Sequence, residues 1–244
     1  MFYVDRCIGC GRCVVACCQG AHEISNGVHR YIQDKCISCG NCTETCYAQA
    51  LVVTGRWMTV GEVVAEVLRD KVFYEMSNGG VTLSGGDPLV QLGFSQALLE
   101  QFKAEGLDTA IETAANCPWR SFAKLLPVTD LVMIDIKHLE PGKHRNATGV
   151  LNQRILSNAR RLASTEKPVI IRVPIVPSVN DTVEEVTAIA RFVKDFPNLQ
   201  YIEFLPFHRL GEGKYHALGL EYPASHLQMP SKAKMNELAT EARR

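Results

Sequence analysis

The chain has 244 residues, which is enough for one large domain and a small additional one. Its apolar fraction of 46% and charged fraction of 21% are those of an ordinary globular protein. The formal net charge is zero and no apolar run is long enough to cross a bilayer. We therefore expect neither nucleic acid nor a membrane as a partner.

Eight of the ten cysteines form two runs of the pattern C-x2-C-x2-C-x3-C. In bacterial ferredoxins with this spacing, three thiolates of one run bind one 4Fe–4S cluster and the fourth binds the other cluster. The sequence therefore predicts two clusters. The predicted ligands are Cys7, Cys10, Cys13 and Cys46 for the first cluster, and Cys36, Cys39, Cys42 and Cys17 for the second.

Zinc and disulfides are the alternative uses of these cysteines. Zinc sites have C-x2-C pairs separated by a longer spacer, and disulfides need an oxidising compartment. No secretory signal peptide precedes the cysteines, so we expect a cytoplasmic protein. The proline that usually follows the fourth cysteine is replaced by Cys18 and Tyr47. We expect Cys18 to be a small buried residue, with replacement of Cys17 as a ligand as the alternative.

Patterns typical of strands and helices alternate along the chain. Asn26-Gly27 predicts a hairpin turn between the two cysteine runs, and residues 50–53 predict a short strand. Thr59 and Glu62 form a capping box at the start of a helix. Further strands are predicted at 81–83, 109–113, 131–136, 169–173 and 201–205, and further helices near 90–105, from Pro118, at 152–164, from Asp181 and near 230–242.

This alternation indicates an α/β fold with a parallel sheet and right-handed crossovers. We predict a partial (βα) barrel over residues 56–244, preceded by a ferredoxin-like domain with two 4Fe–4S clusters over residues 1–55. Functional side chains of such barrels collect at the carboxyl ends of the strands. That rule selects Ser84 to Pro88, Glu112-Thr113, Asp135 to His138, Arg172 with Pro174, and Pro206 with His208.

Each of these groups also has a plainer interpretation. Gly85-Gly86 fits a tight turn, Asp135 and Lys137 fit a surface ion pair, and Arg172 fits a structural ion pair. Because all five groups fall at one edge of the sheet, we favour a shared polar ligand site. Cys117 has no cysteine near it in the sequence and is expected to be structural.

Several stretches carry a resemblance to a known family. They are the two cysteine runs, SNGGVTLSGGDP at 77–88, DIKH at 135–138, TGV at 148–150, RVPIVP at 172–177 and LPFH at 205–208. In order and spacing they resemble the glycyl radical enzyme activating enzymes, a branch of the radical S-adenosylmethionine (radical SAM) enzymes. The resemblance extends from Cys7 to Pro230, and it is closest to the members that carry a two-cluster ferredoxin-like insert.

The resemblance implies a radical SAM barrel and a specific reaction. A third 4Fe–4S cluster would bind S-adenosylmethionine, whose reductive cleavage gives a 5′-deoxyadenosyl radical that takes hydrogen from a glycine of a partner enzyme. The implied partners are a glycyl radical enzyme of the lyase, dehydratase or decarboxylase type and an electron donor such as flavodoxin or ferredoxin, in an anaerobic host. The positions that match S-adenosylmethionine contacts are Gly85, Gly86, Asp87, Asp135, Ile136, Lys137, Arg172 and His208; none of these is assigned a catalytic step.

Two departures from the family pattern bear on activity. Asp87 stands where the family usually has glutamate, and the family's C-x3-C-x2-C motif does not occur in the sequence. The family places that motif after the first barrel strand, and only six residues precede Cys7. We therefore expect a chain that lacks this strand and is inactive alone, through a late start assignment, a split gene or decay. The alternatives to an enzyme are a 4Fe–4S electron-transfer protein and an inactive remnant.

Overall fold

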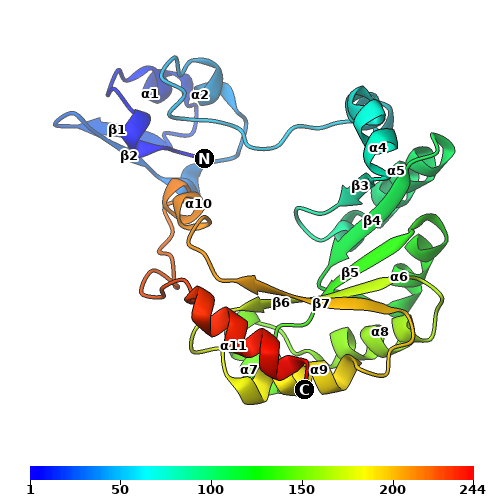
Figure 1. Ribbon diagram of the computed structural model, residues 1–244. Helices are drawn as coiled ribbons and strands as arrows, with labels where there is room; N and C mark the ends of the chain where they lie inside the picture. Colours follow the sequence, from blue (N-terminus) through cyan, green and yellow to red (C-terminus); the bar gives the residue numbers. More distant parts are fainter. The chain divides into compact units, whose positions relative to one another are not determined.

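The computed structural model describes residues 1–244 and divides them into two units (Figure 1). The smaller unit contains Met1–Trp57 and His208–Leu227, and the larger unit contains Met58–Phe207 and Gln228–Arg244. The chain thus leaves the smaller unit two residues after the predicted boundary and returns to it after the last strand of the sheet. The function of the first 55 residues as a two-cluster domain stays a prediction.

The two cysteine runs of the smaller unit fold alike. In the first run a 3-10 turn at Val4–Arg6 precedes α1 (Arg12–Ala16), and in the second a 3-10 turn at Gln33–Lys35 precedes α2 (Asn41–Glu44). Gly11 and Gly40 precede the two helices with φ angles of 76° and 85°, a region that side chains of other residues rarely adopt. The repeat in the sequence is therefore a repeat in the backbone.

A hairpin lies between the two runs in the sequence. Strands β1 (His22–Ser25) and β2 (Val28–Tyr31) pair antiparallel, and the turn residues Asn26 and Gly27 have φ angles of 52° and 77°. Positive φ at both positions is the type I′ geometry that Asn-Gly favours. The predicted hairpin is confirmed.

The predicted strand at 50–53 is wrong as a strand. Leu51 makes only an isolated antiparallel bridge with Phe2, supported by a hydrogen bond of 2.7 Å from the Tyr3 amide to the Ala50 carbonyl oxygen. The partner segment is the first few residues of the chain, which then turn into the first 3-10 helix, so the ladder is too short to form a sheet. α10 (Glu212–Ala217) joins the same unit through a hydrogen bond of 2.8 Å from the Phe2 amide to its last carbonyl.

The larger unit is built on a five-stranded parallel sheet (Figure 1). Its strands, in spatial order and in chain order, are β3 (Gly80–Leu83), β4 (Asp108–Thr113), β5 (Leu131–Asp135), β6 (Val169–Ile175) and β7 (Leu199–Pro206). Every neighbouring pair is parallel. The five predicted strands and the α/β class are confirmed, since a helix between each pair of strands is what parallel neighbours require.

Helices connect and flank these strands. They are α3 (Val60–Val67), α4 (Lys71–Ser77), α5 (Leu92–Ala104), α6 (Trp119–Leu125), α7 (Pro141–Thr148), α8 (Gln153–Ala163), α9 (Val183–Val193) and α11 (Lys232–Ala242), with 3-10 turns at Leu68–Asp70, Pro88–Gln91 and Leu126–Val128. The capping box of Thr59 and Glu62 is confirmed. The predicted cap of α9 is wrong by one residue: Thr182 accepts the Glu185 amide, whereas Asp181 accepts the Ser178 amide in the preceding turn.

The two faces of the sheet differ in chemistry. Ile111, Ile134 and Ile171 lie on neighbouring strands, are fully buried and form the main core together with the helices. Successive residues of a strand point to opposite faces. The residues that alternate with these isoleucines include Glu112, Asp135 and Arg172. One face of the sheet is therefore the core and the other carries charged side chains.

Asp130 connects α5 to the start of β4 through its side chain, so its contribution to the stability of the larger unit can be tested. It accepts hydrogen bonds from the Thr109 amide at 2.8 Å and the Thr109 hydroxyl at 3.0 Å, and pairs with Lys103 at 2.8 Å. Burial alone would raise the pKa of Asp130, but the hydrogen bonds from Lys103 and Thr109 outweigh it and hold the pKa below its usual value. The folded state therefore favours the ionised form.

We expect Asp130→Asn to lower the free energy of unfolding at pH 7 by ~1 kcal/mol, since the carboxylate is partly exposed. The deficit should be complete above a pH of about 3.9, the pKa of an unfolded aspartate, and should shrink as the pH falls below it. Urea unfolding at pH 7 and at lower pH measures it. The exposed Asp195→Asn is the matched control, and a deficit in Asp130→Asn that does not change with pH would contradict the assignment.

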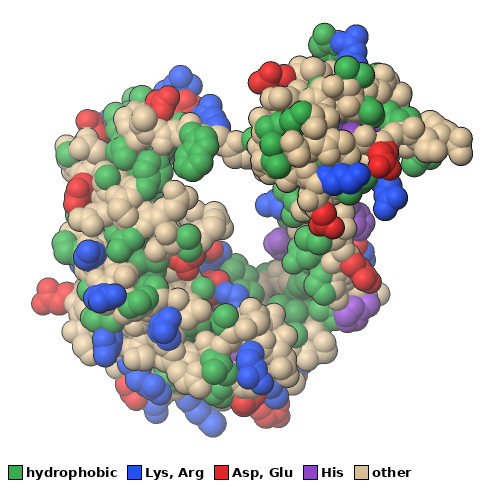
Figure 2. All heavy atoms as spheres, turned by 180° about the vertical axis from the view of Figure 1, so that it is seen from behind, with side chains coloured by type: hydrophobic (Ala, Val, Ile, Leu, Met, Phe, Trp, Pro, Cys, Tyr) green, Lys and Arg blue, Asp and Glu red, His purple; other side chains and the backbone are tan.

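The surface of the larger unit shows no single dominant charge. On the face drawn in Figure 2, basic and acidic side chains are interspersed over this unit. None of the helices has both the length and the apolar character that a membrane span requires.

Candidate functional site

The four cysteines predicted to bind the first cluster line one pocket of the smaller unit. Its walls include Cys7, Cys10, Cys13 and Cys46, together with apolar side chains such as Ile24 and Leu51. The empty space is about 330 Å³, counting its opening to solvent. Burial raises the pKa of the Cys13 thiol, and the neighbouring Cys7 and Cys10 add to this when ionised. The thiols are thus close enough to repel one another as thiolates.

The four cysteines predicted to bind the second cluster, Cys17, Cys36, Cys39 and Cys42, also lie close together. Burial raises the pKa of Cys42, and the neighbouring thiolates of Cys17 and Cys36 raise it further. Backbone amides point at two of these sulfurs: the Ala21 amide donates to Cys17 Sγ and the Ser38 amide to Cys36 Sγ, both at 3.3 Å. Mutual repulsion of thiolates is relieved when a cation binds among them. Cys17 lies with the second run, as the crossed ligand pattern requires.

The other two cysteines lie apart from these sets. Cys18 is exposed, so its predicted burial is wrong, and its sulfur accepts a hydrogen bond of 3.6 Å from the Gln19 amide group. It faces solvent because the chain turns directly after α1. Cys117 belongs to the larger unit, where it is partly buried and packs against the main core, in line with a structural role.

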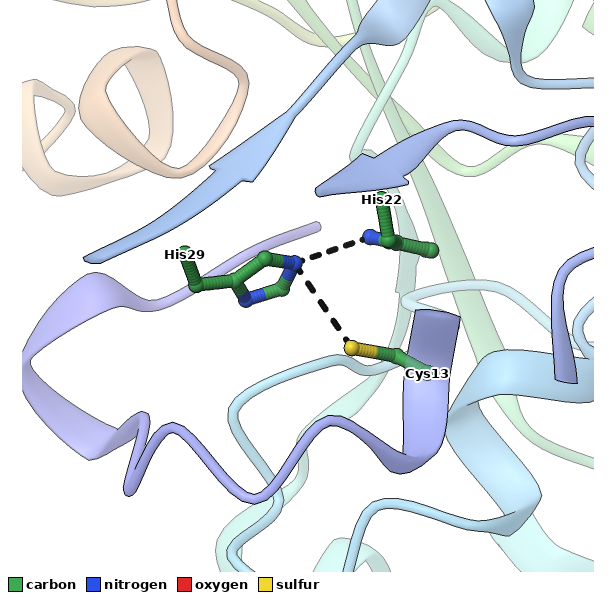
Figure 3. A group of neighbouring side chains, drawn as sticks. All are labelled: Cys13, His22 and His29. Atoms are coloured by element: carbon green, nitrogen blue, oxygen red, sulfur yellow. Dashed lines mark hydrogen bonds between the residues drawn. The ribbon is translucent and has the colours of Figure 1, made fainter. Parts of the chain in front are cut away.

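Sequence reasoning missed two buried histidines beside the first set. Nδ1 of His29 lies 3.4 Å from Cys7 Sγ. Its Nε2 lies 3.6 Å from Cys13 Sγ and 3.0 Å from Nδ1 of His22 (Figure 3). Burial lowers the pKa of both imidazoles, which favours their neutral forms. The signal was present in the sequence, because the hairpin between the cysteine runs holds both histidines.

The charged face of the larger unit carries a connected network. Arg172 on β6 pairs with Glu112 on β4 and, through Nε at 2.9 Å, with Glu203 on β7. The hydroxyl of Ser84 donates to Glu112 at 3.0 Å. The Arg172 side chain thus reaches across β5 to Glu112, and the same guanidinium also pairs with Glu203 on the neighbouring strand. Glu112 was selected by the strand-end rule, whereas Glu203 was missed, although it is an acidic residue in the middle of an otherwise mostly apolar strand.

Asp135 and Lys137 form a second ion pair at the same ends of the strands. Lys137 Nζ lies 2.7 Å from Asp135 Oδ2, and the Lys137 side chain is one-third exposed. Asp135 is the register partner of Arg172, so this pair lies beside the network just described. Ile136 lies between Asp135 and Lys137 in the sequence, and its side chain is buried in the core. Its backbone amide donates a hydrogen bond of 2.9 Å to the Arg172 carbonyl oxygen. Only the Ile136 carbonyl is left for a ligand.

The glycine loop after β3 is held in place by Asp87. Its carboxylate accepts hydrogen bonds from the Leu89 amide at 3.0 Å, the Thr113 hydroxyl at 2.8 Å and the Ala114 amide at 3.0 Å. Asp87 therefore fastens this loop to the end of β4. A Cβ placed on Gly85 or Gly86 would meet no atom within 4 Å, so open space lies over both glycines.

His208 belongs to the smaller unit, whereas the other predicted S-adenosylmethionine residues belong to the larger one. Its Nδ1 accepts the Leu210 amide at 3.4 Å. The larger unit alone therefore brings together the glycine loop, the Asp135–Lys137 pair and Arg172.

Comparison with known proteins identifies the family. Residues 35–193, more than half of the chain, match the model of the Radical SAM superfamily. The chain belongs to the radical SAM superfamily. It is 41% identical over 231 residues to the isethionate sulfite-lyase activating enzyme of Desulfovibrio desulfuricans, covering 92% of this chain and 74% of that protein. It is 38% identical over 229 residues to the choline trimethylamine-lyase activating enzyme of Oleidesulfovibrio alaskensis, covering 91% and 74%.

Within this superfamily the chain belongs to the glycyl radical enzyme activating enzymes. A solved domain of the pyruvate-formate lyase-activating enzyme from Bacteroides vulgatus superposes with a TM-score of 0.57 at 25% identity, covering 68% of this chain and 93% of that one. The predicted family and the radical SAM type of the α/β fold are confirmed. Membership in the superfamily implies a 4Fe–4S cluster and S-adenosylmethionine as cofactors.

The residues fit these cofactors in part. The two gathered sets of four thiols have the soft donors and the spacing that iron–sulfur clusters need. Open space over Gly85 and Gly86, beside ion-paired carboxylates and cations, fits a zwitterionic ligand. A C-x3-C-x2-C set is not among the 244 residues, so no residue here is matched to an open-iron cluster.

Proposed function

We propose that the chain acts as a glycyl radical enzyme activating enzyme. In that reaction, reductive cleavage of S-adenosylmethionine gives a 5′-deoxyadenosyl radical, which takes a hydrogen atom from a glycine of a partner enzyme. The observation that carries the proposal is the 41% identity to an activating enzyme across nine-tenths of the chain. We assign no step of the reaction to a C-x3-C-x2-C cluster, because the sequence holds no such set.

We propose two 4Fe–4S clusters in the smaller unit, each with three ligands from one run and one from the other. What supports this is the common pocket of the first four cysteines and the nearness of Cys42 to Cys17 and Cys36. Such clusters carry one electron at a time, and the ionised thiols of this chain hold them. The electron donor we infer is a flavodoxin or a ferredoxin, and the compartment is the cytoplasm.

We propose that S-adenosylmethionine binds at the charged face of the larger unit. Gly85 and Gly86 leave space for its methionine part beside the end of β3. Asp135 supplies a carboxylate for a cationic group, and Lys137 with Arg172 supplies cations for a carboxylate. Asp87 acts by holding the glycine loop, and Ile136 acts through its carbonyl. The shorter Asp87 holds the loop although the family usually has glutamate there. The contact of His208 with S-adenosylmethionine stays a prediction, since His208 belongs to the smaller unit.

The partner is a glycyl radical enzyme of the lyase, dehydratase or decarboxylase type. The relatives activate lyases of this general kind: their names specify isethionate sulfite-lyase and choline trimethylamine-lyase. The second candidate function, a 4Fe–4S electron-transfer protein, is favoured by the exposed positions of Cys10 and Cys39 near the surface of the smaller unit. An electron carrier, however, has no use for a charged binding face in the larger unit.

Lys137→Met distinguishes these two functions. We expect the variant to bind S-adenosylmethionine about 10-fold to 100-fold more weakly, the loss that follows from removing a hydrogen bond to a charged group. Calorimetric titration of the anaerobically reconstituted chain with S-adenosylmethionine measures it. Lys124→Met, on an exposed position of α6, is the control and should bind as the wild type does.

The iron content of both variants should equal that of the wild type, since neither lysine lies in the smaller unit. Undiminished binding by Lys137→Met would contradict the placement of the ligand site. A wild-type chain that holds iron but shows no affinity for S-adenosylmethionine would favour the electron carrier.

A further inference from the structure

Two buried histidines of the smaller unit reach the cysteines of the first set from the hairpin. His22 is the first residue of β1 and His29 lies on β2, and their side chains are on the same face of the hairpin. His22 is 2% exposed and His29 is 8% exposed. Figure 3 shows one nitrogen of the His29 ring, Nε2, facing both Nδ1 of His22 and the Cys13 sulfur. Neither histidine has a place in the function proposed above.

The contacts of His29 determine where its hydrogen lies. A neutral imidazole has one N–H and one lone pair. A cluster-bound thiolate carries no hydrogen, so Nδ1 of His29, 3.4 Å from Cys7 Sγ, must be the N–H for this contact to be favourable. Nε2 is then the lone pair, and it can accept the N–H from Nδ1 of His22 at 3.0 Å. This proton arrangement satisfies the two shorter contacts of His29, and the longer one, 3.6 Å from Nε2 to Cys13 Sγ, then carries no hydrogen.

We propose that His29 donates a hydrogen bond to Cys7 Sγ that raises the reduction potential of the cluster bound by the first set, and that His22 is a positioning residue holding His29 in this tautomer. The inference rests on the cluster assignment of the proposed function. Reduction adds negative charge to the cluster and its sulfur ligands. An N–H dipole directed at one of those sulfurs stabilises the added charge.

The same strand supplies a different donor to the other set. Tyr31 lies two residues after His29, and its hydroxyl lies near Cys36, where it lowers the pKa of that thiol. Residues two apart on a strand share a face. The hairpin therefore presents one donor to each set, an imidazole N–H to the first and a hydroxyl to the second, and gives the two clusters different surroundings.

A mononuclear metal site is the competing use of these residues. The sulfur of Cys13 and nitrogens of His22 and His29 lie within 4.8 Å of one another, which would suit zinc. Cys13 also lines the pocket that holds Cys7, Cys10 and Cys46. Its thiolate cannot serve a separate zinc ion and complete a four-cysteine cluster at once, and the four-thiol pocket favours the cluster.

The test is a redox titration followed by electron paramagnetic resonance on the anaerobically reconstituted chain. We expect His29→Leu to make one of the two potentials more negative by ~59 mV, a tenfold change in a one-electron equilibrium. His29→Asn places an amide N–H where Nδ1 lay and should recover most of the shift. Tyr31→Phe should lower the other potential and leave the first unchanged.

His22→Phe tests the positioning role. It keeps a ring against Tyr31 but removes the donor to His29, so we expect a smaller shift in the same potential. Combined with His29→Leu it should add nothing, because His22 acts only through His29. If His29→Leu loses its cluster, the His22→Phe shift decides instead.

Other results would overturn the inference in distinct ways. Unchanged potentials in His29→Leu with both clusters present would refute the role of His29 and leave the cluster assignment standing. Zinc in the purified chain that is lost in His22→Phe would establish the mononuclear site instead. A wild-type chain that holds no cluster at the first set would overturn the cluster assignment itself, and the inference with it.

Discussion

Cys17→Ser is expected to halve the iron content of the reconstituted protein, from about eight atoms to about four, because it removes the ligand that crosses from the first run to the second cluster. Cys17 lies near Cys42 and accepts the Ala21 amide, so its sulfur is already oriented within the second set. Iron and sulfide analysis, with the absorbance of the clusters, measures the loss.

Cys18→Ser is the matched control, one residue along the same chain. Cys18 is exposed and its sulfur accepts a hydrogen bond from its neighbour Gln19, so iron content and absorbance should not change. The comparison is informative because sequence spacing alone left Cys18 open as a substitute for Cys17. Equal losses in the two variants would mean that the loop shifts on cluster binding. No loss in Cys17→Ser would contradict the crossed ligand pattern.

The sequence predicted best what depends on short-range pattern. Strands β5, β6 and β7 consist mostly of apolar residues, and each of the five strands was placed to within two residues at either end. The capping box of α3 and the Asn-Gly hairpin were also predicted, since each is fixed by neighbouring residues. By contrast, α7 went unpredicted because its residues are largely polar and give no apolar face. The strand at 50–53 failed because a strand needs a partner of its own length.

In the candidate site too, features that depend on neighbouring residues were predicted and features that depend on distant residues were not. Spacing predicted the cysteine sets and the strand-end rule predicted Asp135, Lys137 and Arg172. Neither the spacing nor the strand-end rule could predict which residue each of these side chains contacts. Arg172 reaches Glu112 across an intervening strand, and His29 meets Cys7 only through the register of a hairpin. Such contacts depend on how distant segments pack together, which no local pattern encodes.

Arg172 has two roles that can be separated, one in the sheet and one toward the ligand. It is the shared cation of Glu112 and Glu203, and its own side chain is 18% exposed. Removing it leaves two partly buried carboxylates without their counter-ion. Breaking a buried ion pair at one partner costs several kcal/mol, and the partial exposure of both acids reduces that figure. A loss of ligand binding in Arg172→Met alone would therefore be ambiguous.

We expect Arg172→Met to lower the free energy of unfolding of the larger unit by ~2–3 kcal/mol. Urea unfolding followed by Trp119 fluorescence measures it, in a Trp57→Phe background, since Trp57 lies in the smaller unit and is fully exposed. A triple variant that adds Glu112→Gln and Glu203→Gln removes the unpaired charges and should regain most of this stability.

The triple variant also separates the two roles, because it restores the sheet without restoring the cation. If Arg172 contacts S-adenosylmethionine, the triple variant should fold almost as stably as the wild type and still bind the ligand about tenfold or more weakly. Recovery of both stability and affinity would show that Arg172 only neutralises its two acidic neighbours. Recovery of neither would mean that its alkyl and guanidinium packing, rather than its charge, holds the strand ends together.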